Sequence, residues 1–176
     1  PRRSLKSRAL QLLAQRDQSR LELRRKLLRH LRSAQAAGIA DVDIADEAAR
    51  APAAAEVEPL LDWLEANGFL SNERFAESRV HARQSRFGLL RIKSELGRHD
   101  VGLPAELAQS LAASELERAA AVRERRFAAL PADAAERAAQ SRFLLARGFA
   151  PELVHRLMRG LGRAPADAEP VANDPA

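Results

Sequence analysis

The residues best suited to chemistry in this chain of 176 residues are its four histidines, and their spacing supports no metal or catalytic site. His30, His81, His99 and His155 stand far apart, and none belongs to a His-Glu-x-x-His arrangement that would place two imidazoles together on zinc. Glu77 lies one helical turn before His81, but two ligands alone do not hold a metal ion. We therefore expect structural histidines and no bound metal.

Phosphate-binding and nucleophile motifs are also missing from the sequence. Gly97 and Gly102 have the separation of the outer glycines of a phosphate-binding loop, but Leu103 and Pro104 follow where Lys and Ser or Thr are required. No Gly-x-Ser-x-Gly or Gly-x-Gly-x-x-Gly pattern occurs, and the absence of cysteine excludes disulfides and cysteine-based zinc sites. The sequence thus predicts a protein that is not an enzyme and needs no cofactor.

The strongest chemical signal is positive charge, of which arginine supplies 26 of 29 residues. Residues 1–32 hold 11 Lys or Arg and 2 acidic residues (11 − 2 = +9), whereas residues 33–66 hold 1 and 8 (1 − 8 = −7). Arginine grips phosphate or carboxylate through two parallel hydrogen bonds, so this segregation predicts a polyanion or an acidic protein surface as partner. The alternative is a solvated basic face with no specific role.

Apolar residues recur at helical spacing along most of the chain, and strand signals are nearly absent. No apolar run approaches the roughly 20 residues that a membrane helix needs, so a cytoplasmic protein is expected. Helices are expected to begin at Leu5, Ser19, Val57, Ser71, Leu89 and Pro104, and to span about 114–129, 132–147 and 151–161.

The second of these helices is the most basic. Ser19 and Glu22 have the capping-box form, in which both side chains bond to amides that the first turn leaves unpaired. Leucine and arginine then fall on opposite faces: Leu23, Leu27 and Leu31 on one, Arg25, Arg29 and Arg32 on the other. This helix should therefore bury one side and present the other as a cationic surface.

Helix junctions repeat along the chain. Residues 12–19 align without a gap on residues 143–150, and Leu23 and Leu27 align on Ile92 and Leu96. The apolar positions recur more faithfully than the charges, so the repeat is a packing unit first. Units of two or three helices that cannot bury their apolar faces alone stack into an elongated, curved array.

The chain is divided accordingly into helical repeats at 1–67, 68–113 and 114–162. An acidic, mobile insertion is expected at 33–54 and a disordered tail at 163–176, since neither has a sustained apolar stripe.

Aromatic residues are few, and they stand at helix ends or within apolar stripes. Core packing is therefore favoured over base stacking, and any contact with nucleic acid should be electrostatic and tolerant of sequence. The residues concerned are Trp63, Phe69, Phe75, Phe87, Phe127, Phe143 and Phe149.

Residues 68–76, Gly-Phe-Leu-Ser-Asn-Glu-Arg-Phe-Ala, resemble a signature of the RecX family, regulatory proteins that modulate the bacterial recombinase RecA. Residues 9–27, 88–96 and 142–149 resemble the family's first, central and last helix pairs. The match covers about residues 5–161 in the expected order. One departure is Leu89, where the family often has proline after the central glycine.

The resemblance implies an all-α protein of tandem three-helix repeats, about nine helices in all, that lies along the groove of a RecA–DNA filament. It implies inhibition of filament growth, ATP hydrolysis, strand exchange and co-protease activity, and thereby a role in DNA repair and the SOS response. The implied partners are the RecA filament and single- and double-stranded DNA, contacted through phosphates by a monomer.

The residues expected to touch DNA or RecA lie in the first and central helix pairs: Arg20, Arg24, Arg25, Lys26, Arg83, Arg86, Arg91 and Lys93. Two other functions remain open. One is an independent DNA-binding regulator that reads duplex DNA with a basic helix, and the other is a helical-repeat adaptor for an acidic protein.

Overall fold

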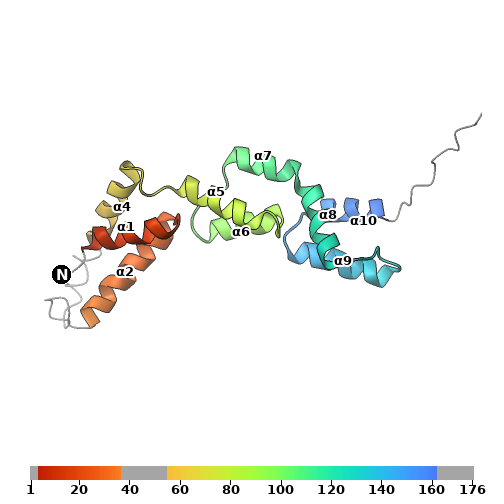
Figure 1. Cartoon of the computed structure of the whole chain (residues 1–176), viewed down its shortest axis with the longest axis horizontal. Helices are drawn as coiled ribbons and strands as arrows, with labels where there is room; N and C mark the ends of the chain where they lie inside the picture. The colour runs from red at the N-terminus through yellow and green to blue at the C-terminus, as the bar shows by residue number, and fades with distance from the viewer. Residues whose placement is uncertain (1–3, 37–54, 162–176) are drawn as a thin grey trace, which may run out of the picture. The chain divides into compact units, whose positions relative to one another are not determined.

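The computed structural model describes residues 4–36 and 55–161, and these ranges contain only helices and their connections (Figure 1). The helices are α1 (Leu5–Gln15), α2 (Arg20–Ala36), α4 (Val57–Ala66), α5 (Asn72–Arg83), α6 (Leu89–Gly97), α7 (Ala105–Ala113), α8 (Glu115–Arg126), α9 (Ala134–Ala146) and α10 (Pro151–Leu161). The prediction of an all-α fold is therefore confirmed.

Most predicted helix starts agree with the structure because the capping residues were correctly identified. The amide of Glu22 donates to Ser19 Oγ and that of Arg74 to Ser71 Oγ, both over 3.1 Å. The second half of the predicted capping box does not form, because the Glu22 carboxylate instead accepts from Arg16 and Lys26.

The predicted insertion at 33–54 begins too early, since α2 continues through Ala36 and makes its first four residues helical. Residues 37–54, and the tail predicted to be disordered at 163–176, lie outside the described residues.

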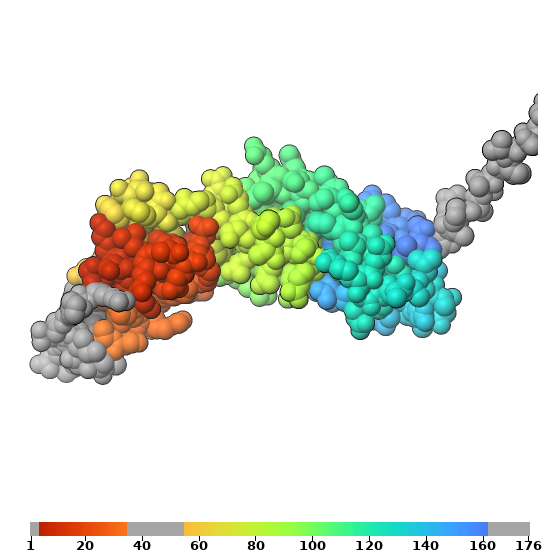
Figure 2. Space-filling model, in the orientation of Figure 1, coloured from red at the N-terminus to blue at the C-terminus, as the bar shows by residue number. Residues whose placement is uncertain are grey.

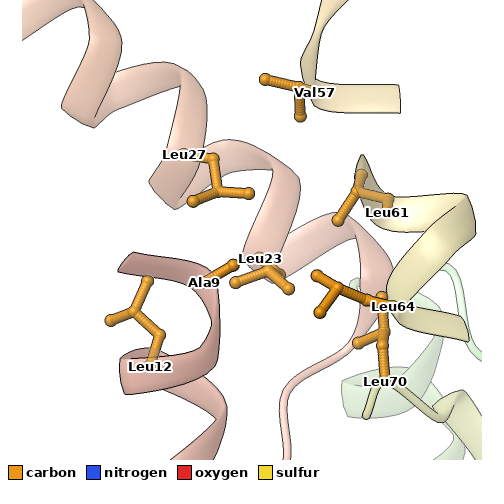
Figure 3. Packing of buried hydrophobic residues seen from close by; sticks show 8 residues of the cluster. All are labelled: Ala9, Leu12, Leu23, Leu27, Val57, Leu61, Leu64 and Leu70. Carbon is orange, nitrogen blue, oxygen red and sulfur yellow. The ribbon is translucent and has the colours of Figure 1, made fainter. Parts of the chain in front are cut away.

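The chain divides into two compact units, which we name by their residues. Unit 1 comprises residues 1–82 and 93–107, and unit 2 comprises residues 83–92 and 108–176. In unit 1, leucines of α1, α2 and α4 converge on one apolar cluster (Figure 3). Its members are Ala9, Leu12, Leu23, Leu27, Val57, Leu61, Leu64 and Leu70. Removing these apolar side chains from water is the main source of stability for the three helices.

Unit 2 has a smaller core, in which α10 packs on both α8 and α9. Its buried members are Ala119, Val122, Leu144, Phe149, Val154 and Met158. The core also encloses a polar pair: Arg123 donates to Gln140 Oε1 over 2.8 Å and to the Ala129 carbonyl over 2.6 Å. These bonds offset the free-energy cost of burying a guanidinium and an amide.

The repeat expected from the sequence is visible in the structure, because apolar residues are buried at the same positions of three helices. The fourth and eighth residues of α2, α6 and α10 are all buried, whereas the charges between them differ. The pairs are Leu23 and Leu27, Ile92 and Leu96, and Val154 and Met158. Residues four apart lie on one helix face, so each helix presents the same apolar stripe to its core.

Three helix ends share one backbone motif, the Schellman motif, in which a left-handed residue reverses the chain. At the end of α4, Gly68 has φ +72°, its amide donates to the Glu65 carbonyl, and the next amide donates to that of Leu64. Gly148, with φ +79°, closes α9 in the same way. The left-handed glycine predicted at 68 is therefore confirmed.

The third motif follows α6 and places Asp100 at φ +56°. The left-handed position is therefore not occupied by Gly97 or Gly102, the glycines from which the sequence predicted this helix end. An L-residue pays a steric penalty in this conformation that glycine avoids.

Asp100→Gly is expected to stabilise the protein by about 1 kcal/mol, because it removes the strain of a left-handed Cβ. Thermal and urea unfolding measure the change. Gly68→Ala is the control for the opposite change. Open space surrounds the site, so only the positive φ opposes the new Cβ, and the free energy of unfolding should fall by about 1 kcal/mol. Destabilisation by Asp100→Gly would show that the carboxylate itself holds this turn.

Candidate functional site

Arg20, the first residue of α2, joins this helix to α4. Its guanidinium donates to Glu58, Asp62 and Glu65 over 2.9, 2.7 and 2.6 Å. Asp62 follows Glu58 by four residues and Glu65 follows Asp62 by three, so the three acids lie on one face of α4 and a single guanidinium can reach them all. Burial lowers the pKa of Arg20, but the three carboxylates outweigh burial and raise this pKa well above its ordinary value. Arg20 is therefore a structural cation.

Arg24 and Lys26 are also neutralised within unit 1. Arg24 pairs with Glu58 on α4, whereas Lys26 donates to Glu22 and to the buried amide oxygen of Gln18, each over 2.9 Å. The Gln18 side chain in turn donates to the Leu12 carbonyl over 2.7 Å, so Lys26 belongs to a network that fixes the turn between α1 and α2. Neither cation is free to bind a partner without losing an internal contact.

The acids in these pairs make the stability of unit 1 depend on pH. Burial raises the pKa of Glu22, but hydrogen bonds from Arg16 and Lys26 outweigh burial and lower this pKa below its ordinary value. Hydrogen bonds from Arg24 and Arg20 likewise lower the pKa of Glu58. A lowered folded-state pKa adds stability above the unfolded value, which is about 4.3, and this stability is lost as pH falls through the folded-state pKa.

We therefore expect Glu22→Gln to lower the melting temperature at pH 7, and the difference from the wild type to shrink as pH falls below the lowered pKa of Glu22, where the wild-type carboxylate is protonated as well. Circular dichroism melts over a series of falling pH values test this. A difference that stays the same throughout the series would contradict an electrostatic role for Glu22.

The opposite face of α2 carries cations with no such partners. Arg25, Arg29 and Arg32 are exposed, as predicted, and no ion pair joins them to another residue of the described chain. Arg29 and Lys26 line an open pocket of about 350 Å³ on this side of unit 1, together with Arg8, Leu12, His30 and Ser33. We call Arg25, Arg29 and Arg32 the α2 arginine face. Its guanidinium groups are available to external oxyanions.

A second group of cations surrounds Phe87, in the turn between α5 and α6. The guanidinium carbons of four arginines lie 4.5–5.8 Å from the centre of its ring, a distance at which the ring face attracts a cation. They are Arg83, Arg86, Arg91 and Arg147. Arg91 also donates to the Ala146 carbonyl over 3.3 Å, so it fixes the turn after α9.

Two arginines of α8 and the arginine that follows α9 hold the backbone of this turn. Arg118 donates to the carbonyls of Gln84 and Phe87 over 2.9 and 3.0 Å, and burial lowers its pKa. Arg125 donates to the Ser85 carbonyl, and Arg147 reaches that of Arg86 over 3.5 Å. Four successive carbonyls therefore accept bonds from arginine, which orders a turn that has no regular structure of its own.

Three of these arginines, Arg86, Arg125 and Arg147, also line an open pocket of about 210 Å³ in unit 2, together with Arg126. Ser85, Val122 and Phe143 complete its wall, and no carboxylate lines it. The Nε of Arg147 is buried without a hydrogen-bond partner among the described atoms. We call this the unit 2 arginine pocket. A cavity lined by several cations and an unused donor is suited to an oxyanion.

The predicted contact residues thus differ in their surroundings. Arg25 and Lys93 are exposed, Arg86 lines the unit 2 arginine pocket, Arg20, Arg24 and Lys26 hold unit 1 together, and Arg83 and Arg91 lie against Phe87. Arg125, Arg126 and Arg147, which line the same pocket as Arg86, were not among the predicted residues. The run Arg123-Glu-Arg-Arg126 at the end of α8 was the available signal, because its arginines recur on neighbouring helical positions.

Among the described residues, no group of three or more His, Cys, Asp or Glu side chains could hold a metal ion. Within the same ranges, no helix has both the length and the apolar character needed to cross a membrane.

Known proteins resemble this chain over most of its length. It is 50% identical to the regulatory protein RecX of Ralstonia nicotianae over 159 residues, which cover 89% of this chain and 87% of the relative. It is 46% identical to RecX of Herbaspirillum seropedicae over 158 residues, covering 89% and 87%. A family model described as the third three-helix domain of RecX matches residues 113–158.

The fold is similar to a solved structure as well. The crystal structure of RecX from Lactobacillus salivarius superposes with a TM-score of 0.60, covering 90% of this chain and 94% of that one, at 18% identity. This likeness concerns the fold alone. The sequence identities, which extend over nearly nine-tenths of both chains, show that this chain belongs to the RecX family of regulatory proteins.

Proposed function

We propose that this protein binds the RecA recombinase and RecA–DNA filaments and inhibits filament growth, ATP hydrolysis, strand exchange and co-protease activity. It would thereby modulate DNA repair and the SOS response. The observation that carries the proposal is the 50% identity with a regulatory protein RecX over 89% of the chain. The protein acts by binding, without catalysis or a cofactor, as a cytoplasmic monomer built of three repeats at 1–67, 68–113 and 114–162.

The distribution of charge supports a polyanionic partner. The α2 arginine face has no internal partners among the described residues, and no carboxylate lines the unit 2 arginine pocket. Cations in this situation lose no internal ion pair when a phosphate or carboxylate arrives. We therefore assign contacts with the filament to Arg25, Arg86 and Lys93 among the predicted residues, and add Arg29 and Arg126.

The experiment is a titration of RecA on single-stranded DNA with the protein, measuring ATP hydrolysis and co-sedimentation with the filaments. Free single-stranded and duplex DNA without recombinase are the controls. We expect saturable co-sedimentation and a fall in ATP hydrolysis. Unchanged ATP hydrolysis at saturating protein would refute the proposal, and sequence-selective duplex binding without recombinase would support the DNA-reading regulator instead.

A further inference from the structure

Trp63 and Phe69 form an exposed aromatic pair on unit 1. Core packing was expected for both residues, and this expectation is wrong: 37% of Trp63 and 46% of Phe69 remain exposed. Their rings stack nearly in parallel, with centroids 5.6 Å apart and planes inclined by 19°. A large aromatic surface kept open to water beside a well-packed core suggests a binding function.

The helix end itself explains the contact between the two rings but not their exposure. In a Schellman motif the residue after the left-handed glycine packs on the last turn of the helix, as Phe69 packs on Trp63. The same motif at the end of α9 places Phe149 and Phe143 at these positions.

The corresponding aromatic residues of unit 2 are covered by the chain. Phe149 is 1% exposed, and Phe143 meets Phe127 edge-on at 5.2 Å between centroids. No described aromatic residue covers Trp63 and Phe69 in this way. The same motif thus occurs twice, and its aromatic pair is covered by the protein in unit 2 but exposed to solvent in unit 1.

Cations border the open pair. Lys6 of α1 places its ammonium 3.4 Å from the centre of the Trp63 ring, and the surfaces of α1 and α4 meet on the face shown in Figure 2. Arg74 donates to the carbonyls of Gly68 and Phe69 over 2.9 and 3.2 Å and pairs with Asp17 over 3.5 Å, so its guanidinium stays beside the backbone of Phe69. An exposed ammonium–ring contact is weak and can be exchanged for another ligand.

We propose that the Trp63–Phe69 pair is a stacking platform for an unpaired base of single-stranded DNA, with Lys6 and Arg74 contacting the flanking phosphates. Parallel aromatic rings accept any base on their faces, and adjacent cations suit the backbone charge that accompanies it. An apolar protein segment would use the same surface without needing the two cations. The inference rests on the proposed function for its choice of polymer and adds direct recognition of bases.

The intrinsic fluorescence of the full chain tests this directly, because Trp63 is the only tryptophan and the chain has no tyrosine. We expect an oligothymidylate of about 15 nucleotides to quench Trp63 emission saturably, and inorganic polyphosphate at equal charge, which can bind Lys6 but has no base to stack, to change it far less. Binding of a labelled oligonucleotide without a change in emission would overturn the proposal, as would no binding. A change caused by recombinase alone would point to a protein partner instead and would also overturn it.

Variants separate stacking from folding. Phe69→Leu keeps an apolar contact for the helix end and removes the aromatic face, so we expect roughly a fivefold to hundredfold loss of oligonucleotide affinity at unchanged helicity. Leu130→Ala, at an exposed leucine of unit 2, is the matched control and should bind as the wild type does. Equal affinity of Phe69→Leu and wild type would overturn the proposal. Inhibition of recombinase ATP hydrolysis is measured separately, so failure of stacking and failure of the proposed function give different results.

Discussion

Gly88→Ala is expected to destabilise the protein by about 3 kcal/mol and to lower its melting temperature by roughly 6–12 °C. A Cβ at Gly88 would lie 2.3 Å from the Gly148 carbonyl oxygen and 2.4 Å from the Phe149 nitrogen. The Gly88 amide also donates to the Arg147 carbonyl over 2.9 Å, which locks the two backbones at this separation. Backbone atoms cannot escape by changing rotamer, so the whole turn must move.

Gly97→Ala is the matched control, because it adds the same methyl group at the other end of α6. Nothing lies within 4 Å of the position its Cβ would take, and alanine favours helix over glycine by up to about 1 kcal/mol. Circular dichroism melts should therefore move in opposite directions for the two variants. Wild-type stability of Gly88→Ala would show that the α6 start and the α9–α10 turn do not approach as described.

Two changes on α2 are expected to separate binding from stability. Replacing both Arg25 and Arg29 by alanine should weaken binding to the recombinase–DNA filament about tenfold and reduce the salt dependence by about two phosphate contacts. The melting temperature should stay near that of the wild type, because neither residue has an ion-pair partner in the described chain. Sedimentation with filaments across a salt series gives both quantities.

Arg20→Ala is the converse change on the same helix. It removes three ion pairs and leaves Glu58, Asp62 and Glu65 to repel one another, at a cost of about 1–2 kcal/mol. Filament affinity should be unaffected at temperatures where the variant is folded. A loss of affinity for Arg20→Ala without a loss of stability would instead support a direct contact between Arg20 and the filament.

Much of the fold follows from local rules that act within a few residues. Ser19 and Ser71 cap helices because their hydroxyls accept hydrogen bonds from backbone amides three residues further along the chain. Gly68 reverses the chain because glycine tolerates a positive φ. Leucines spaced by four residues predicted the buried stripe of α2. Family membership could likewise be predicted from short motifs in their order along the chain.

The surroundings of the predicted contact residues could not be predicted in the same way, because the spacing of arginines does not tell which acids lie opposite them. Arg20 and Arg25 look equivalent in the sequence, yet α4 supplies three carboxylates to the first and none to the second. The same holds for aromatic residues, since Phe149 is buried by its core whereas Phe69 is left open.

By itself, the sequence determined that this protein is helical, where most of its helices begin, which apolar positions repeat and to which family it belongs. Only the tertiary structure decided which arginines are neutralised, which aromatic pair stays exposed, and that the turn at Gly88 meets the backbone of Gly148. Caps and amphipathic stripes depend on near neighbours in the chain. Charge pairing, exposure and close backbone approach depend instead on residues that are distant in the sequence, such as Arg20 and Glu58, 38 positions apart, or Gly88 and Gly148, 60 positions apart.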